Sequence, residues 1–124
     1  MIAERELSLD ELVRKLKKPE IGAIVTFLGV VRRAADGEHV SGMNIAMNEQ
    51  EAENVLEQLK REAVATFDVE AVEIVHRKGV LAVGDSIVAI LVGAGHRKEA
   101  FRACEYIIDA LRISDAIRLQ ELET

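Results

Sequence analysis

Apolar residues recur at helical spacing in three parts of this chain. Ser8, followed three residues later by Glu11, has the signature of a capping box, and the apolar positions after it predict a helix that stops at Pro19. A single apolar stripe with the same period runs through 49–67 and through 97–112, which predicts two longer helices.

Continuous apolar and β-branched runs predict the strands between these helices. They cover 21–32, 40–48, 69–76, 80–92, where Gly84-Asp85 forms a turn between a short and a longer strand, and 116–122. The first run is apolar almost throughout, so we expect that strand to be mostly buried. Asp36-Gly37 signals a turn before the second run. Hairpins, rather than a regular alternation of strand and helix, indicate an α+β fold.

Length and composition narrow the possible classes of protein. A chain of 124 residues suits one domain spanning 1–124, and its 49% of hydrophobic residues is enough for a sizeable core. With 16 Lys and Arg against 22 Asp and Glu, the net charge is −6. We therefore expect no nucleic-acid partner, although one local basic site remains possible.

Cys104 is the only cysteine, so an intramolecular disulfide is impossible, and no Cys/His cluster has zinc spacing. It falls on the apolar stripe of the last predicted helix, where a small buried hydrophobe is expected rather than a nucleophile. The charged N-terminal segment has no signal-peptide core, and no apolar run approaches the roughly 20 residues that span a membrane. A cytoplasmic location without a membrane partner is the expectation.

The segment "GAGHRKEAF" carries an unusual charge pattern for a helix start. It places His96, Arg97 and Lys98 at the end that already bears partial positive charge, where each exposed cation costs roughly 0.3–1 kcal/mol. A bound anion would reverse that sign, because helix N-termini bind phosphate readily and the two preceding glycines let a ligand approach the backbone. The alternative is a set of solvated side chains whose charge Glu99 partly offsets.

Other candidate residues are ambiguous when taken singly. Arg32 and Arg33 end the first predicted strand, where they either aim at the same anion or mark a solvated strand end. Phe27 lies inside that strand and is core by default. His76 and Arg77 begin a tight turn, where a structural role is expected. No P-loop, dinucleotide fingerprint or serine-triad order occurs, so the residues alone indicate a candidate oxyanion site at a strand–helix junction.

Three segments taken together resemble the large, catalytic subunit of molybdopterin synthase. They are "GAIVTFLGVVR" (22–32), "VHRKGVLAVGDSIVAILVGAGHRKEAF" (75–101) and "IIDALR" (107–112). The family carries a G-A-x-x-x-F-x-G-x-V-R strand, an H-R-x-G-x-L-x-x-G-D/E hairpin, and an H-R-x-x-A-F helix start followed by I-D-x-L-K. Each motif is weak alone, but their joint order and spacing over 22–112 are fairly specific.

The resemblance implies an activity, a fold and partners. The family enzyme serves molybdenum cofactor biosynthesis by adding two sulfurs to cyclic pyranopterin monophosphate (precursor Z), a pterin phosphate, which forms molybdopterin. Sulfur arrives as a thiocarboxylate on the Gly-Gly C-terminus of a small ubiquitin-like sulfur-carrier subunit, and a homodimer of large subunits is the centre of a heterotetramer. The implied fold is an α/β hammerhead-type domain with an additional antiparallel β subdomain. No metal and no other cofactor is implied.

The resemblance also implies site residues. Phe27, Arg32, His96 and Arg97 match positions that line the family's substrate pocket, where the basic side chains would hold the phosphate. Arg112 stands where the family has a catalytic lysine and is our catalytic candidate. An arginine keeps the charge but stays protonated, so it cannot readily act as a nucleophile or proton shuttle.

A second lysine expected in the family falls on Leu119, which supplies neither charge nor a proton. Whether the chain is an enzyme therefore stays open at this point. It is either an active synthase subunit or a catalytically impaired homologue that binds a phosphorylated ligand or ubiquitin-like partner as a regulatory module. A purely structural dimer without a ligand is a third alternative.

Helix length sets a condition on the predicted site. Arg97 and Arg112 are 15 positions apart on one predicted helix, which separates them by about 22 Å at 1.5 Å per residue. They cannot both contact one small phosphate within a single chain. If both serve one pocket, a two-fold dimer must bring opposite ends of two such helices together.

Overall fold

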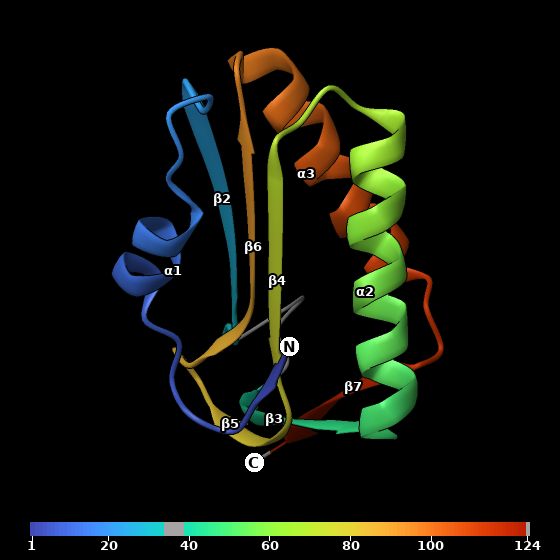
Figure 1. Ribbon diagram of the computed structural model, residues 1–124. Coiled ribbons are helices and arrows are strands. Elements are labelled where there is room, and N and C mark those ends of the chain that lie inside the picture. The colour runs from blue at the N-terminus through green and yellow to red at the C-terminus, as the bar shows by residue number, and fades with distance from the viewer. Residues whose placement is uncertain (34–38, 124) are drawn as a thin grey trace.

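The computed structural model describes residues 1–33 and 39–123, and within them the chain forms three helices and seven strands (Figure 1). In chain order the elements are β1 (Ile2–Ala3), α1 (Leu9–Leu16), β2 (Ala23–Val30), β3 (Val40–Met47), α2 (Glu49–Thr66), β4 (Ala71–Arg77), β5 (Gly79–Ala82), β6 (Ser86–Ala94), α3 (Arg97–Arg112) and β7 (Ile117–Glu123). The predicted turn at Asp36-Gly37 lies outside the described residues.

The strands divide into two sheets. A four-stranded sheet has the order β1-β4-β6-β2, and a three-stranded sheet has the order β5-β3-β7. β1 runs parallel to β4, while the other neighbouring pairs are antiparallel. Figure 1 shows the smaller sheet at the end of the larger one where the chain leaves α3 and enters β7. The predicted α+β class, with a second antiparallel sheet, is confirmed.

β6 is the central strand and is buried along its whole length. Val88, Ile90 and Val92 belong to the core beneath α2 and α3, whereas Ala89 and Leu91 belong to a smaller core beneath α1. Figure 1 shows α1 on one side of the larger sheet and the two longer helices on the other. Because helices cover both faces, both sets of alternating side chains must be apolar, which explains the continuous apolar run in the sequence.

The three described helices begin in different ways. Ser8 caps α1 by accepting the backbone N–H of Glu11 at 3.4 Å, as the sequence predicted, and Asn48 caps α2 by accepting that of Glu51 at 3.0 Å. His96 occupies the same position at α3 but makes no side-chain capping bond. Since a capping side chain typically contributes about 1 kcal/mol, α3 starts without a stabilising contact that α1 and α2 both have.

The short strand β1 is a feature that sequence analysis missed. It is held against β4 by backbone bonds from His76 N–H to the Met1 carbonyl oxygen at 2.9 Å and from Lys78 N–H to the Ala3 carbonyl oxygen at 3.1 Å. Two residues are too few to show an alternating pattern, so only the pairing partner reveals the strand.

Arg77 was predicted to lie in a turn but is the last residue of β4 and is buried. Its Nη2 donates to the Glu4 carbonyl oxygen at 3.0 Å, and its Nη1 lies 3.4 Å from the Glu6 carboxylate. The turn itself is tighter than predicted and uses Gly79, whose φ of 97° suits glycine. Arg77 therefore has the structural role that the sequence suggested, tying the N-terminal segment to the larger sheet.

Two absences hold for the described part of the chain, 1–33 and 39–123. No helix there is long and apolar enough to cross a membrane. No group of three or more His, Cys, Asp or Glu side chains there is arranged to hold a metal ion.

Candidate functional site

A cavity of about 510 Å³ opens where the C-terminal end of α3 meets the larger sheet and β7. Residues from five elements and one loop line it: Phe27, Gly29, Val30, Arg32, His76, Ile87, Val88, Ile90, Ile108, Leu111, Arg112 and Leu119. Nine of these are apolar or glycine, and the other three are two arginines and a histidine. A mainly apolar wall with a few polar groups is the usual composition of a small-molecule site.

A β-bulge shapes the floor of this cavity. Gly29 pairs with Val88, but the next residue, Val30, pairs with Ser86, so Ile87 is left over in β6. The extra residue breaks the strict alternation of the strand, which lets the consecutive side chains of Ile87 and Val88 both line the cavity. Gly29 has no side chain, and the space beside it is taken by Val88 and the Phe27 ring, since a Cβ there would lie 3.1 Å from Cγ1 of Val88 and 3.5 Å from Cε2 of Phe27.

Arg32 lines the cavity because backbone hydrogen bonds fix the residue before it, Val31. Val31 is buried, and its N–H donates to the Asp85 carbonyl oxygen at 3.0 Å, while its carbonyl accepts from Gly84 N–H at 2.8 Å. Gly84 closes the β5–β6 turn with a φ of 94°. With the Val31 side chain directed inward, that of Arg32 is left exposed at the cavity wall.

Arg112 is the last residue of α3 and comes to the cavity together with Ile108 and Leu111. The spacing of three and four residues puts all three side chains on one face of the helix. A cation at a helix C-terminus is favourable by about 0.3–1 kcal/mol. No carboxylate of the described residues forms an ion pair with Arg112 or Arg32, so the cavity has positive charge available for an anion.

His76 is the third polar residue of the wall, and only 4% of it is exposed. Its Nδ1 lies 2.8 Å from the carbonyl oxygen of Arg77, and because a carbonyl can only accept, Nδ1 carries the hydrogen. Burial lowers the pKa of His76 below its ordinary value, against the opposing effect of that hydrogen bond. The neutral form of the ring is therefore favoured.

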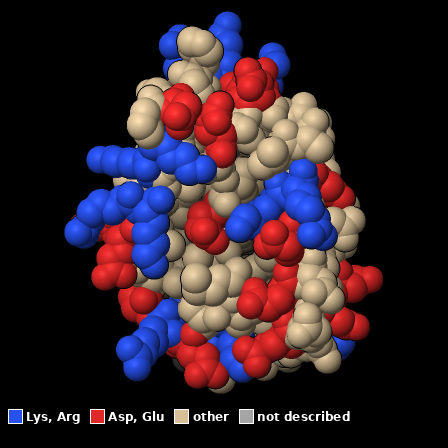
Figure 2. Space-filling model, viewed as in Figure 1, with Lys and Arg blue, Asp and Glu red and all other residues tan. Residues whose placement is uncertain are grey.

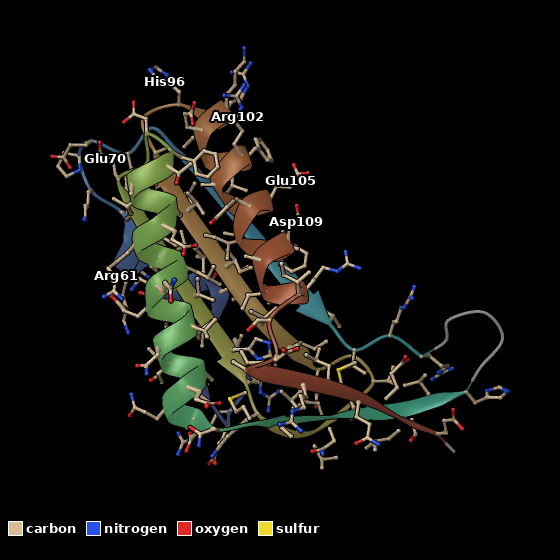
Figure 3. All side chains as sticks on the ribbon, turned by 90° about the vertical axis from the view of Figure 1, so that its right-hand side faces the viewer. Arg61, Glu70, His96, Arg102, Glu105 and Asp109 are labelled. Atoms are coloured by element: carbon tan, nitrogen blue, oxygen red, sulfur yellow. The ribbon has the colours of Figure 1, made fainter. Side chains whose placement is uncertain are left out.

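The predicted site residues fall into two groups. Phe27, Arg32 and Arg112 meet at the cavity, and Leu119 lies beside them. His96 and Arg97 do not: both are exposed at the other end of α3, which runs as one continuous helix. Figure 3 labels His96 at that end. Within one chain the structure thus keeps the two groups apart, as the helix length required.

Two smaller expectations have clear outcomes. Gly93 was expected to let a ligand approach the backbone, but a Cβ there would lie 2.6 Å from Cδ1 of Ile21, so its missing side chain makes room for packing. Cys104 is buried in the main core, and burial raises the pKa of its thiol to about 11. A buried, protonated thiol is a hydrophobic side chain rather than a nucleophile, as expected.

His76 was given no site role from the sequence, although the spacing of residues in its strand pointed to one. His76 follows Val72 and Ile74 at a spacing of two, so it falls on the core face of β4. A polar residue in phase with buried apolar ones is unusual enough to suggest a function. Because His76 was expected to begin a turn, its alignment with the buried positions of the strand was not recognised.

Charge on the protein surface is mixed. On the side that Figure 2 shows, Lys and Arg lie among Asp and Glu and do not form one broad basic face. This agrees with the net charge of −6 and with a positive charge that is local to the cavity.

Comparison with known proteins places these features in a family. The family model described as "MoaE protein" matches residues 2–114. The molybdopterin synthase catalytic subunit of Thermoplasma volcanium is 33% identical over 111 residues, which cover 90% of this chain and 81% of that protein.

Solved structures agree with the sequence relatives. A crystal structure of molybdopterin synthase from Staphylococcus aureus matches with a TM-score of 0.94 and 28% identity over 99% of this chain and 90% of that one. The fold also matches a chain in the complex of subunits 1 and 2 of molybdopterin-converting factor from Helicobacter pylori, with a TM-score of 0.77, 22% identity, and coverage of 98% and 83%. With motifs, fold and relatives in agreement, the chain belongs to the MoaE family of molybdopterin synthase large subunits.

Proposed function

We propose that this chain is the large subunit of molybdopterin synthase and acts in molybdenum cofactor biosynthesis, in the cytoplasm. The observation that carries the proposal is the cavity, where Phe27 and Arg32 of one motif meet Arg112 of another in an apolar wall. The substrate is cyclic pyranopterin monophosphate. Its flat ring suits the apolar wall, and its phosphate suits the guanidinium group of Arg32.

The sulfur donor is a small ubiquitin-like subunit whose C-terminal Gly-Gly ends in a thiocarboxylate. The Helicobacter pylori complex of two converting-factor subunits supports a small-subunit partner for this fold. Val30 and Leu119 are 45% and 48% exposed at the cavity wall, and they offer an apolar entrance for a narrow tail. Arg112 then stabilises negative charge on the thiocarboxylate as sulfur is transferred, a role that needs a fixed cation and no proton transfer.

A second copy of the chain completes the site. His96 and Arg97 are exposed at the far end of α3, so a two-fold dimer can present them to the cavity of the partner. Their charges would then meet the phosphate, which offsets the cost of cations at a helix start. Two large subunits with one small subunit at each end form the proposed heterotetramer.

The decisive experiment mixes the purified chain with precursor Z and the thiocarboxylated small subunit and measures dithiolene formation. We expect product, because relatives named as catalytic subunits match over most of the chain. Binding of both components without product would contradict the proposal and leave a binding module.

Lysine replacements test how the chain works where the resemblance expects lysine. The variants Arg112→Lys and Leu119→Lys, separately and together, should retain or raise the rate of dithiolene formation, since they restore the residues of the family pattern. A lower rate in both single variants would show that the arginine is itself the adapted catalytic group.

A further inference from the structure

His76 is a buried polar side chain with one ring nitrogen that no protein group uses. Nδ1 donates to the Arg77 carbonyl oxygen at 2.8 Å, so in the neutral ring Nε2 carries the lone pair. Within 1–33 and 39–123, no hydrogen bond reaches Nε2. The single fully buried nitrogen or oxygen without a partner in that part of the chain is Nε of Arg77, which means that Nε2 of His76 is not sealed. It keeps access to the cavity that His76 lines.

The sheet register places His76 in a row whose other members are apolar. His76 pairs with Val88, and Val88 pairs with Gly29 on its other side, so the three residues form one row across the sheet. Paired residues of antiparallel strands point to the same face, and Gly29 contributes no side chain to that face. No neighbour of His76 in this row offers it a hydrogen bond, and Ile87 and Ile90, which line the same cavity, are also apolar.

The charged groups that line the cavity with His76 are the cations Arg32 and Arg112. The Met1 ammonium, just before β1, donates to the Ile74 carbonyl oxygen at 2.9 Å and pairs with the Glu53 carboxylate at 3.2 Å. Burial and, to a smaller extent, the N-terminal charge lower the pKa of His76, against the opposing effect of the bond to the Arg77 carbonyl, so Nε2 remains an acceptor at neutral pH. An acceptor cannot bind the oxygens of a cyclic phosphate diester, which carry no hydrogen.

We propose that Nε2 of His76 accepts a hydrogen bond from a ring N–H or amino group of the pterin, and so distinguishes a pterin phosphate from other small phosphates. The assignment rests on the proposed function and deepens it. Arg32, together with His96 and Arg97 of the second copy, binds the phosphate, while His76 recognises the donor edge of the heterocycle. A pocket that hydrogen-bonds a substrate discriminates strongly against analogues that lack the group.

Two isosteric variants separate this role from a structural one. His76→Asn places an amide N–H near the position of Nδ1, which keeps the bond to the Arg77 carbonyl but removes the acceptor at the Nε2 position. His76→Gln places its amide oxygen near Nε2 and loses the bond to Arg77. Glu73→Gln is the control, because Glu73 lies on the same strand outside the cavity lining and is half-buried beside Lys60.

Titration calorimetry with precursor Z and, separately, inorganic phosphate provides the measurement. We expect His76→Asn to weaken precursor Z binding about tenfold or more and to leave phosphate binding unchanged, whereas His76→Gln retains more pterin affinity at lower thermal stability. Equal precursor Z affinity in wild type and His76→Asn would overturn the assignment while the proposed function stands. A wild type that binds no precursor Z would overturn both.

Binding of the small subunit gives a further check on what His76 recognises. If His76→Asn weakened binding of that subunit but not of precursor Z, the acceptor would serve the protein tail, and the assignment would be wrong. Nitrogen-15 NMR of the imidazole is the spectroscopic counterpart. We expect Nδ1 to be protonated and Nε2 unprotonated with and without precursor Z, and the opposite tautomer would make His76 a donor and exclude the proposed contact.

Discussion

The two ends of α3 have similar charges but very different surroundings. At the C-terminal end, Arg112 lines a mainly apolar cavity together with residues of β2, β4, β6 and β7. At the N-terminal end, His96 and Arg97 are exposed, and the capping position is taken by a side chain that does not cap. The labelled side chains in Figure 3 show how far the start of the helix lies from β7. One end lines a cavity of its own chain, and the other has cations that do not line it.

The difference separates a charge that stabilises the helix by itself from charges that are unfavourable unless an anion is bound. A cation at the C-terminus of a helix is favourable by itself, so Arg112 needs no ligand to explain its position. Cations at the N-terminus are unfavourable, and a missing cap adds to that cost. In the proposed dimer, the phosphate bound in the cavity of one chain would lie at the start of α3 of the other chain. Its negative charge would offset the cost of the cations there.

The comparison of the two ends assumes that α3 is rigid and keeps them a fixed distance apart. Replacing Ile107 tests this assumption. This residue is fully buried in the middle of the helix, so Ile107→Ala should lower the free energy of unfolding by about 2–5 kcal/mol. Asp109→Ala, on the exposed side of the same helix, should change it by less than about 0.5 kcal/mol. Denaturant titration measures both. Similar small losses would mean that α3 is loosely held and that its ends are not a fixed distance apart.

The cavity end should dominate catalysis. Arg112→Ala removes a cation beside the reacting groups and should reduce kcat/KM for dithiolene formation by about 100-fold or more. Arg102→Ala is the matched control, since Arg102 is exposed on the same helix and pairs with Glu99 at 3.4 Å. Steady-state kinetics of both variants gives the answer. An Arg112→Ala enzyme with the rate of the control would remove Arg112 from the site.

Mixed dimers test whether the exposed end serves the cavity of a second chain. When Arg97→Ala and Arg112→Ala chains are co-expressed in equal amounts, half of the dimers are mixed, and each mixed dimer has one intact site. The mixture should recover about one quarter of the wild-type activity, although each variant alone is nearly inactive. Recovery no greater than the sum of the two variants would show that Arg97 and Arg112 do not share a cavity.

The missing cap of α3 should produce the smallest effect. His96→Asn provides a capping oxygen and should raise the free energy of unfolding by about 0.5–1 kcal/mol while lowering dithiolene formation. Ser8→Ala, which removes a working cap from α1, should lower the free energy of unfolding by a similar amount without changing the rate. Thermal unfolding and kinetics are measured side by side. If His96→Asn kept full activity, His96 would have no part in binding the substrate.

Much of the secondary structure was predictable because periodicity is local. The longer strand predicted within 80–92 is β6, which the structure extends to Ala94, and the capping signal at Ser8 gave the start of α1 to the residue. One error came from an edge strand: the run over 21–32 was expected to be mostly buried, but β2 ends its sheet, and Leu28 and Val30 are 40% and 45% exposed. The other errors came where the local pattern carries no signal. β1 consists of two residues that only β4 identifies, and Arg77 looked like part of a turn until its bonds to the N-terminal segment were known.

The candidate site was only partly predictable for the same reason. Motif spacing identified Phe27, Arg32 and Arg112 singly, and the structure brings all three to one cavity. His76 went unassigned because its importance depends on the row that it shares with Val88 and Gly29. The spacing of residues along the chain does not show which strands pair with one another in a sheet.

By itself, the sequence determined the α+β class, the positions of the long helices, the family resemblance and the distance between Arg97 and Arg112, because each depends on period, motif order or rise per residue. The tertiary structure decided which side chains converge. Strand pairing, the bulge at Ile87 and the packing of α3 set the shape of the cavity and which atom of His76 faces it. These features arise from contacts between residues far apart in the chain, and so only the folded molecule could reveal them.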